Sequence, residues 1–162
     1  MTTGILQQEP LTSSYSFVGQ SDEAAQLEYQ VKWPTNQLYE PVQYMEPYRR
    51  ILREMEELLL DCLEDNWDGY RARGASIESY ECAQRFILSL PIQWLNPEVA
   101  VDPDGEFSFD WFGVRGALLT ISVGPSGQLT YAGRFGAARA HGLELLSEGI
   151  PKEILSCLAR LT

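Results

Sequence analysis

The stretch EVAVDPDGEFSFDWF, residues 98–112, decides the fold class because two apolar runs lie on either side of a turn. Phe107, Phe109 and Trp111 alternate with polar residues, which is the period of a strand that buries one face. Pro, Asp and Gly at positions 103–105 are typical of a tight turn. The stretch therefore predicts a short strand, a turn and a second strand.

The segment ALLTISVGPSGQLTYAGRF, residues 117–135, repeats this pattern around Gly-Pro-Ser-Gly, a typical hairpin turn. We therefore predict four short strands in an antiparallel meander. The sheet side of the core is predicted to consist of Phe107, Phe109, Trp111, Leu119, Ile121, Leu129 and Tyr131. The opposite face carries Ser108, Asp110, Thr120, Ser122 and Thr130, and we expect it to meet water or a partner.

Two helical segments precede the predicted sheet. In YMEPYRRILREMEELLLDCLED, residues 44–65, apolar residues recur at helical spacing, and Pro47 suits the first turn of a helix. A second helix begins after Ser76, a favourable N-cap residue, and ends before Pro91. A short helix from Pro151 to about Leu161 is predicted after the sheet.

The predicted fold class is α+β with two layers. A helical hairpin and the C-terminal helix pack on one face of a four-strand antiparallel meander, and residues 44–162 form a single domain. Residues 1–43 are predicted to form an extended N-terminal arm. Within it LEYQVKW, residues 27–33, alternates apolar and polar side chains and could add one strand to a sheet edge.

The predicted arm is rich in aromatic residues, whereas disordered tails are usually poor in them. Aromatic residues dominate the energetics of protein interfaces. We therefore expect the arm either to bind a partner or to lie over the open face of its own sheet. The predicted partner-binding residues are Tyr15, Phe17, Tyr29, Trp33 and Tyr39.

The charge of the chain argues against direct binding to nucleic acid. Among its 162 residues, 23 acidic side chains against 12 basic ones give a formal charge of −11, which repels phosphate backbones and attracts basic surfaces. The first twenty residues lack the pattern of a secretory signal, and no apolar run approaches the ~20 residues of a membrane helix. Three widely spaced cysteines fit reduced thiols, so we expect a cytoplasmic protein without membrane contact.

The segment EDNWDGYRARGAS, residues 64–76, lies between the two predicted helices. We interpret it as a structural turn in which Gly69 takes a positive φ and the side chains of Asn66 and Asp68 accept backbone hydrogen bonds. Trp67 and Tyr70 are predicted to fill the space between the helices, with Trp67 largely buried.

An alternative for the same segment is a metal site. Asp61, Glu64, Asp65 and Asp68 could hold magnesium for phosphoryl chemistry, since carboxylates are the ligands that this ion prefers. A calcium loop is disfavoured because Ala75 occupies the position of the bidentate acid. His141, the only histidine, lies in a Gly- and Ala-rich segment that we predict to be a loop. We therefore predict no catalytic residue and no cofactor.

Three ordered motifs resemble those of a family of small uncharacterised bacterial proteins. They are the N-W-D-G-Y segment, the P-D-G turn before a strand, and the G-P-x-G-x-L-x-Y hairpin, which together span about residues 66–133. The sequence departs from the family pattern at Arg71, where Gly is usual, and at Gly74, where Pro is usual. The resemblance implies a bacterial, cytoplasmic protein and carries no assigned activity.

The absence of catalytic signatures and the acidic, aromatic-rich composition favour a non-enzymatic interaction module, antitoxin- or inhibitor-like, that binds a basic protein partner. A second copy of the chain is an alternative partner. Two other functions stay open: a metal-dependent hydrolase built on the Asp61–Asp68 acids, and a DNA mimic.

Overall fold

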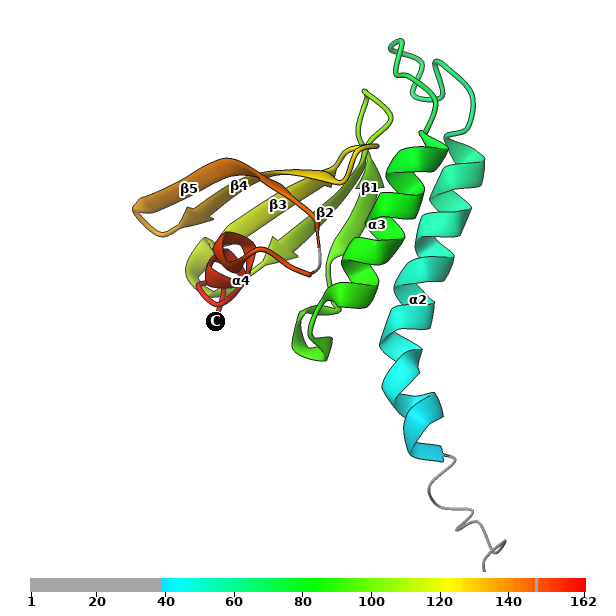
Figure 1. Ribbon diagram of the computed structural model, residues 1–162. Coiled ribbons are helices and arrows are strands. Elements are labelled where there is room, and N and C mark those ends of the chain that lie inside the picture. Colours follow the sequence, from blue (N-terminus) through cyan, green and yellow to red (C-terminus); the bar gives the residue numbers. More distant parts are fainter. Residues whose placement is uncertain (1–38, 148) are drawn as a thin grey trace, which may run out of the picture. The chain divides into compact units, whose positions relative to one another are not determined.

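The computed structural model describes residues 39–147 and 149–162, and residues Pro41–Thr162 form one compact unit (Figure 1). The helices are α2 (Tyr39–Asp61), α3 (Ile77–Ser89) and α4 (Lys152–Leu158), with short 3₁₀ turns η1 (Ile92–Trp94) and η2 (Val114–Gly116). The strands are β1 (Glu98–Val101), β2 (Phe107–Phe112), β3 (Leu118–Val123), β4 (Gln128–Phe135) and β5 (Ala138–Leu145).

The strands form one antiparallel sheet in the order β1-β2-β3-β4-β5, so each strand pairs with its neighbour in the chain. The predicted α+β class and antiparallel meander are confirmed, but the prediction of four strands is wrong. The fifth strand runs through the segment that we expected to be a loop around His141. A two-residue turn at Gly136 and Ala137 connects β4 to β5, with Gly136 at φ +64° as such turns require.

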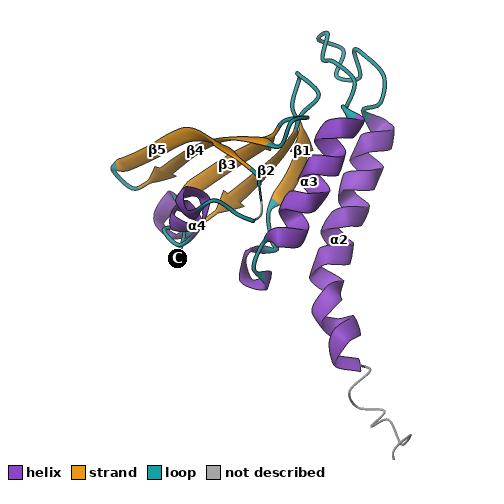
Figure 2. Cartoon of the chain, viewed as in Figure 1, coloured by secondary structure: helices purple, strands orange, loops and turns teal. Residues whose placement is uncertain are grey.

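Helices α3 and α4 lie on the same face of the sheet, and α2 lies along α3 (Figures 1 and 2). The ring of Phe86 on α3 packs against Phe109, with ring centroids 5.6 Å apart, and meets Trp111 edge-on. From α4, Ile154 and Leu158 are fully buried in the same core. The two-layer arrangement therefore has its core between this sheet face and the helices.

The predicted sheet side of the core is buried at six of its seven positions, and Tyr131 is partly buried. Tyr131 lies opposite Gly142 of β5, where an added Cβ would come within 2.7 Å of the tyrosine hydroxyl. The ring therefore occupies the space that a larger side chain on β5 would take. This packing explains the glycine at position 142 of β5.

Helix α2 differs from the sequence prediction at its beginning. It starts at Tyr39, so Pro47 lies inside the helix and the prediction that this proline occupies the first turn is wrong. Proline removes one helical hydrogen bond, and burial of Tyr48, Ile51 and Met55 just after it compensates by fixing this part of α2 in the core. Residues 1–38 lie outside the described residues, as do the predicted binding residues Tyr15, Phe17, Tyr29 and Trp33.

No helix in the described ranges is both long enough and apolar enough to span a lipid bilayer.

Candidate functional site

The segment that joins α2 to α3, residues 62–76, is closed by hydrogen bonds of its own backbone, and we call it the corner. The amide of Asn66 donates to the carbonyl of Ala72 at 2.6 Å, and the amide of Ala75 donates to the carbonyl of Cys62 at 2.7 Å. These two bonds join the beginning and the end of the loop. The corner is therefore a compact turn between the helices.

Side-chain oxygens accept several further amides of the corner. Oδ1 of Asp68 accepts from the amides of Tyr70 at 2.7 Å and Ala72 at 3.1 Å, and Oδ1 of Asn66 accepts from the amide of Arg71 at 3.0 Å. The backbone bonds expected of Asn66 and Asp68 are therefore present, and Gly69 has the expected positive φ of +75°.

The two aromatic residues of the corner have different environments. Trp67 is partly buried against the core, and its Nε1 donates to the carbonyl of Arg73 at 2.9 Å. Tyr70 is 89% exposed, so the prediction that it fills the space between the helices is wrong. Ala72 is buried within the corner instead, and the positive φ values of Gly69 and Arg71 turn the intervening tyrosine toward solvent.

The corner also binds the turn that connects β1 to β2. The amide of Arg73 donates to the carbonyl of Pro103 at 2.8 Å, and the amide of Ser76 donates to the carbonyl of Gly105 at 2.9 Å. An added Cβ at Gly105, whose φ is +88°, would lie 2.4 Å from the carbonyl oxygen of Gly74. The two backbones thus approach so closely that Gly105 has no room for a side chain.

A polar pocket of about 640 Å³ lies where these turns meet the turn between β3 and β4. The P-D-G turn contributes Asp104 to it and the Gly-Pro-Ser-Gly turn contributes Pro125, whereas no residue of the N-W-D-G-Y segment lines it. Burial, reinforced by the charges of Asp104 and Asp102, raises the pKa of Glu106 in this pocket. The lining residues are Asp65, Arg73, Gly74, Ser76, Asp104, Glu106 and Pro125. With three carboxylates and one guanidinium, the pocket favours a cationic group over an anionic one.

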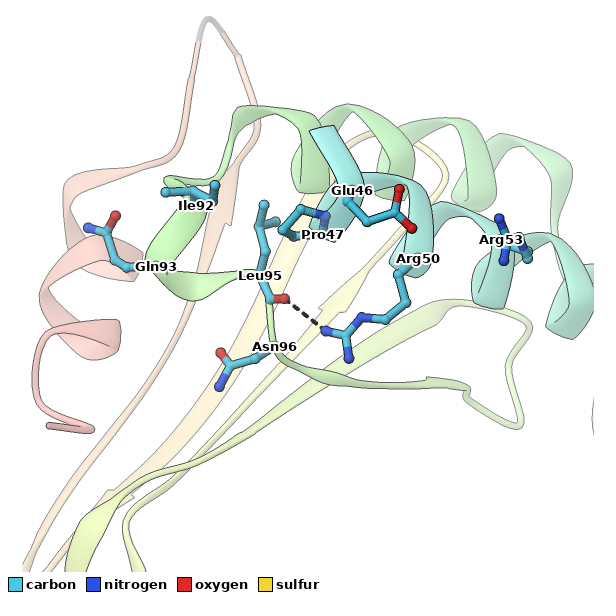
Figure 3. Close-up of a pocket in the computed structure, with 8 residues that line it drawn as sticks. All are labelled: Glu46, Pro47, Arg50, Arg53, Ile92, Gln93, Leu95 and Asn96. Carbon is cyan, nitrogen blue, oxygen red and sulfur yellow. Dashed lines mark hydrogen bonds between the residues drawn. The ribbon is translucent and has the colours of Figure 1, made fainter. Parts of the chain in front are cut away.

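A second pocket, of about 430 Å³, lies between α2 and η1 (Figure 3). The guanidinium of Arg50 donates to the carbonyl of Leu95 at 3.1 Å, which joins α2 to the segment after η1. Figure 3 shows Arg53 pointing away from Arg50, and Glu46 lies on the same rim. The two guanidinium groups therefore do not converge, and the pocket lacks the arrangement that would bind an anion.

The four carboxylates of the alternative metal site do not support metal binding. Oδ1 of Asp65 accepts from the amide of Gly74 at 2.8 Å, and Asp68 accepts two amides, so both carboxylates already serve the backbone. Within residues 39–147 and 149–162, no group of three or more His, Cys, Asp or Glu side chains could hold a metal ion. Asp61, Glu64, Asp65 and Asp68 therefore act as surface and turn residues in this geometry.

The open face of the sheet contains a polar network that the sequence did not reveal. Asp102 accepts hydrogen bonds from the hydroxyls of Ser108 at 2.8 Å and Ser122 at 2.6 Å, and Asp110 accepts one from Thr120. The sequence showed that hydroxyl side chains alternate along the predicted strands. It did not show that Ser108 and Ser122 share the carboxylate of Asp102, because that contact depends on the register of the strands. These polar groups therefore satisfy one another on the face predicted to meet water or a partner.

Several exposed apolar residues lie within or next to the corner in the sequence, and exposed acidic residues lie between them. The large exposed apolar residues of this region are Leu60, Leu63, Tyr70 and Ile77. The exposed acids of the same region are Glu56, Glu57, Asp61, Glu64, Asp65 and Glu78. Protein interfaces combine apolar or aromatic anchors at their centre with a polar rim, and Tyr70 is of the type enriched among such anchors.

Comparison with known proteins does not add to this geometry. No protein-family model matches the sequence, and no curated protein or solved structure matches it. The interpretation of the corner therefore rests on its own residues.

Proposed function

We propose that this chain is a non-enzymatic interaction module, antitoxin- or inhibitor-like, that binds a basic protein partner through the corner. The observation that carries the proposal is Tyr70, which is 89% exposed on a loop whose backbone is fixed on both sides of it. A tyrosine in this position can enter a pocket of a partner with its whole ring. Tyrosine is also one of the residue types most enriched among binding hot spots.

The rigidity of the corner supports this role on energetic grounds. Asp68 and Asn66 hold the amides of Tyr70, Arg71 and Ala72, so the loop has little conformational freedom left to lose on binding. Ordering a flexible loop at an interface costs free energy, and a loop that is already ordered avoids this cost. A larger part of the interaction energy of Tyr70 therefore contributes to the binding affinity.

The distribution of charge supports a basic partner. Residues 39–110 contain 16 acidic and 6 basic side chains, whereas residues 111–162 contain 3 acidic and 5 basic ones. The negative field therefore originates mainly from the half of the unit that contains the corner. Such a field accelerates the association of a positively charged protein, and salt weakens the effect.

The aromatic residues Tyr15, Phe17, Tyr29, Trp33 and Tyr39 are a second part of the proposed binding apparatus. Their contribution is separable from that of the corner. Removal of residues 1–38 deletes four of these five residues and leaves the corner and the helices intact in sequence. Partner binding that survives this truncation and is lost from Tyr70→Ser is binding through the corner.

The test is affinity capture from lysate of the source cells with the full-length chain as bait, in wild-type, Tyr70→Ser and Tyr44→Ser forms. Tyr44 is a matched control because it is also exposed, at 55%, but lies on α2 away from the corner. We expect one basic protein to be retained by the wild type and by Tyr44→Ser and lost from Tyr70→Ser. Its retention should fall as salt is raised.

The two variants must also unfold at the wild-type temperature, since both replaced side chains are exposed. A partner captured equally by all three baits would show that the corner is not the binding surface. A captured partner that is acidic, or whose binding is insensitive to salt, would contradict the electrostatic part of the proposal.

A further inference from the structure

The two edges of the sheet differ in how they are protected. β1 has four residues and lies between Pro97 and Pro103, with the charged Glu98 at its start. β5 has eight residues, contains neither Pro nor Lys, and pairs on one side only in the part of the chain that the structure describes. Short length, proline and charge are the usual devices that keep a sheet edge from pairing. β1 has these devices, whereas the longer β5 edge lacks most of them.

The register of the β4–β5 hairpin identifies which backbone groups of β5 face outward. The amide of Leu146 donates to the carbonyl of Gly127 at 2.8 Å, one step beyond the last pair of the ladder. In antiparallel strands the bonds to one neighbour come from alternate residues. Even-numbered residues of β5 therefore bond to β4. The outward N–H and C=O groups belong to Arg139, His141, Leu143 and Leu145.

The side chains of these same four residues lie on the open face of the sheet. Leu143 is 60% exposed and Leu145 is 59% exposed, and Arg139 and His141 are exposed as well. The one acid of the strand, Glu144, lies on the other face and is partly buried. The β5 edge thus combines outward N–H and C=O groups with two exposed leucine side chains. No carboxylate lies among the four side chains on this face of the strand.

We propose that β5 pairs antiparallel with β5 of a second copy of this chain about a two-fold axis at Gly142, joining two sheets into one. Outward groups meet only where odd-numbered residues oppose odd-numbered ones. An axis at Gly142 satisfies this condition, with His141 opposite Leu143 and Arg139 opposite Leu145. An axis at His141 would place two imidazoles opposite each other, whereas Gly142 lets the two backbones approach closely.

Electrostatics permits this contact between two acidic chains. β5 belongs to residues 111–162, which carry more basic than acidic side chains, so the acidic helical hairpins lie in the other part of each copy. The two Arg139 side chains would lie at opposite ends of the paired strands, about 20 Å apart at ~3.4 Å per residue. That separation exceeds the screening length of about 8 Å at physiological salt.

The test is sedimentation velocity of the full-length chain as wild type, His141→Pro and His141→Thr. Proline removes the outward N–H of residue 141 without removing a bond to β4, because this residue is odd-numbered. Threonine keeps that N–H and is the matched control. We expect the wild type and His141→Thr to sediment as dimers of twice the 18.3 kDa chain mass, and His141→Pro to dimerise at least tenfold more weakly.

A second variant, Leu143→Lys, guards against a folding defect in the proline variant. It introduces a charge on the exposed side of the strand and should also weaken the dimer, with the circular dichroism spectrum unchanged. A wild-type chain that stays monomeric at about 100 μM, a concentration at which any Kd of micromolar or below would give mostly dimer, would overturn the proposal. The proposal would also be wrong if the folded His141→Pro and Leu143→Lys variants dimerised as tightly as the wild type. A monomeric wild type whose β5 amides are protected from hydrogen exchange would point instead to residues 1–38 as the occupant of this edge.

Discussion

Replacement of Ser79 by alanine tests how α3 is joined to the sheet. Ser79 is fully buried, and its Oγ donates to the carbonyl of Val123 at 2.5 Å and accepts from the amide of Phe107 at 3.0 Å. Phe107 and Val123 face each other as a terminal pair of the β2–β3 ladder, and both side chains are fully buried. One hydroxyl therefore satisfies a backbone group on each of two central strands.

The expected loss follows from those two contacts. Ser79→Ala removes a single oxygen atom and, with it, hydrogen bonds to one N–H and one C=O in a place that water does not reach. Each lost hydrogen bond costs about 0.5–1.5 kcal/mol, so we expect the free energy of unfolding to fall by about 1–3 kcal/mol. The change in packed volume is too small to add much to this figure.

The measurement is urea unfolding followed by tryptophan fluorescence, with Ser89→Ala as the control. Ser89 lies on the same helix and donates to the carbonyl of Arg85 at 2.8 Å, but it is exposed, so its loss should change stability by no more than about 0.5 kcal/mol. We expect Ser79→Ala to unfold at a lower urea concentration than the wild type. The slope of the unfolding free energy against urea concentration should stay unchanged. Equal stability of the two variants would refute the bridging role of the Ser79 hydroxyl.

Three further predictions concern the core, the corner and the acidic pocket. Trp111→Ala should lower the free energy of unfolding by about 3–5 kcal/mol in the same urea assay, because Trp111 is 2% exposed and its Nε1 donates to a backbone carbonyl. Asp68→Ala should lower the melting temperature through a loss of about 2 kcal/mol, whereas Asp68→Asn keeps the accepting Oδ1 and should lose less than about 1 kcal/mol. Burial and neighbouring carboxylates raise the pKa of Glu106 in the folded state above its ordinary value of 4.5, so its contribution to stability is fully present below that pH and is lost as the pH rises through the raised pKa. Glu106→Gln should therefore gain stability relative to wild type as urea unfolding is repeated from pH 4 to about 7, and a constant difference would contradict the raised pKa.

The parts of the fold that the sequence predicts correctly are those governed by local pattern. The alternation of Phe107, Phe109 and Trp111 identifies β2 and its buried face, because a strand exposes its two faces in turn. Ser76 precedes α3 as predicted, and its Oγ accepts from the amide of Ser79 at 3.1 Å. Such signals lie within a few residues of the feature that they specify.

β5 escaped prediction because its signal is tertiary. Ala138, Ala140 and Gly142 on its core side give no apolar alternation, since space there is taken by the rings of Tyr131 and Phe135 from β4. An added Cβ at Gly133, opposite Ala140, would lie 2.6 Å from the Phe135 ring. Small residues are therefore a requirement of this hairpin, although in the sequence they resemble a loop.

The corner was predicted in its chemistry and only partly in its geometry. Asn and Asp next to Gly indicate a turn with side-chain acceptors, and Asn66 and Asp68 act in this way. The direction of Tyr70 depends instead on the left-handed conformation of Arg71, at φ +75°, which a non-glycine residue rarely adopts. No local pattern announces that conformation, so the exposure of the tyrosine could not be foreseen.

The strictly sequential order of the strands has a kinetic consequence. Each strand pairs with the one made just before it, so the loops to be closed are short and the sheet should form faster than one with crossed connections. The helical hairpin and the first strands can assemble while synthesis continues. The side of β4 that carries Tyr131 and Phe135 must wait for α4, because Ile154 and Leu158 complete its core only after β5 has been made. A nascent chain paused between β5 and α4 therefore exposes an apolar sheet surface, and this is the stage of biosynthesis at which we expect the protein to depend most on chaperones.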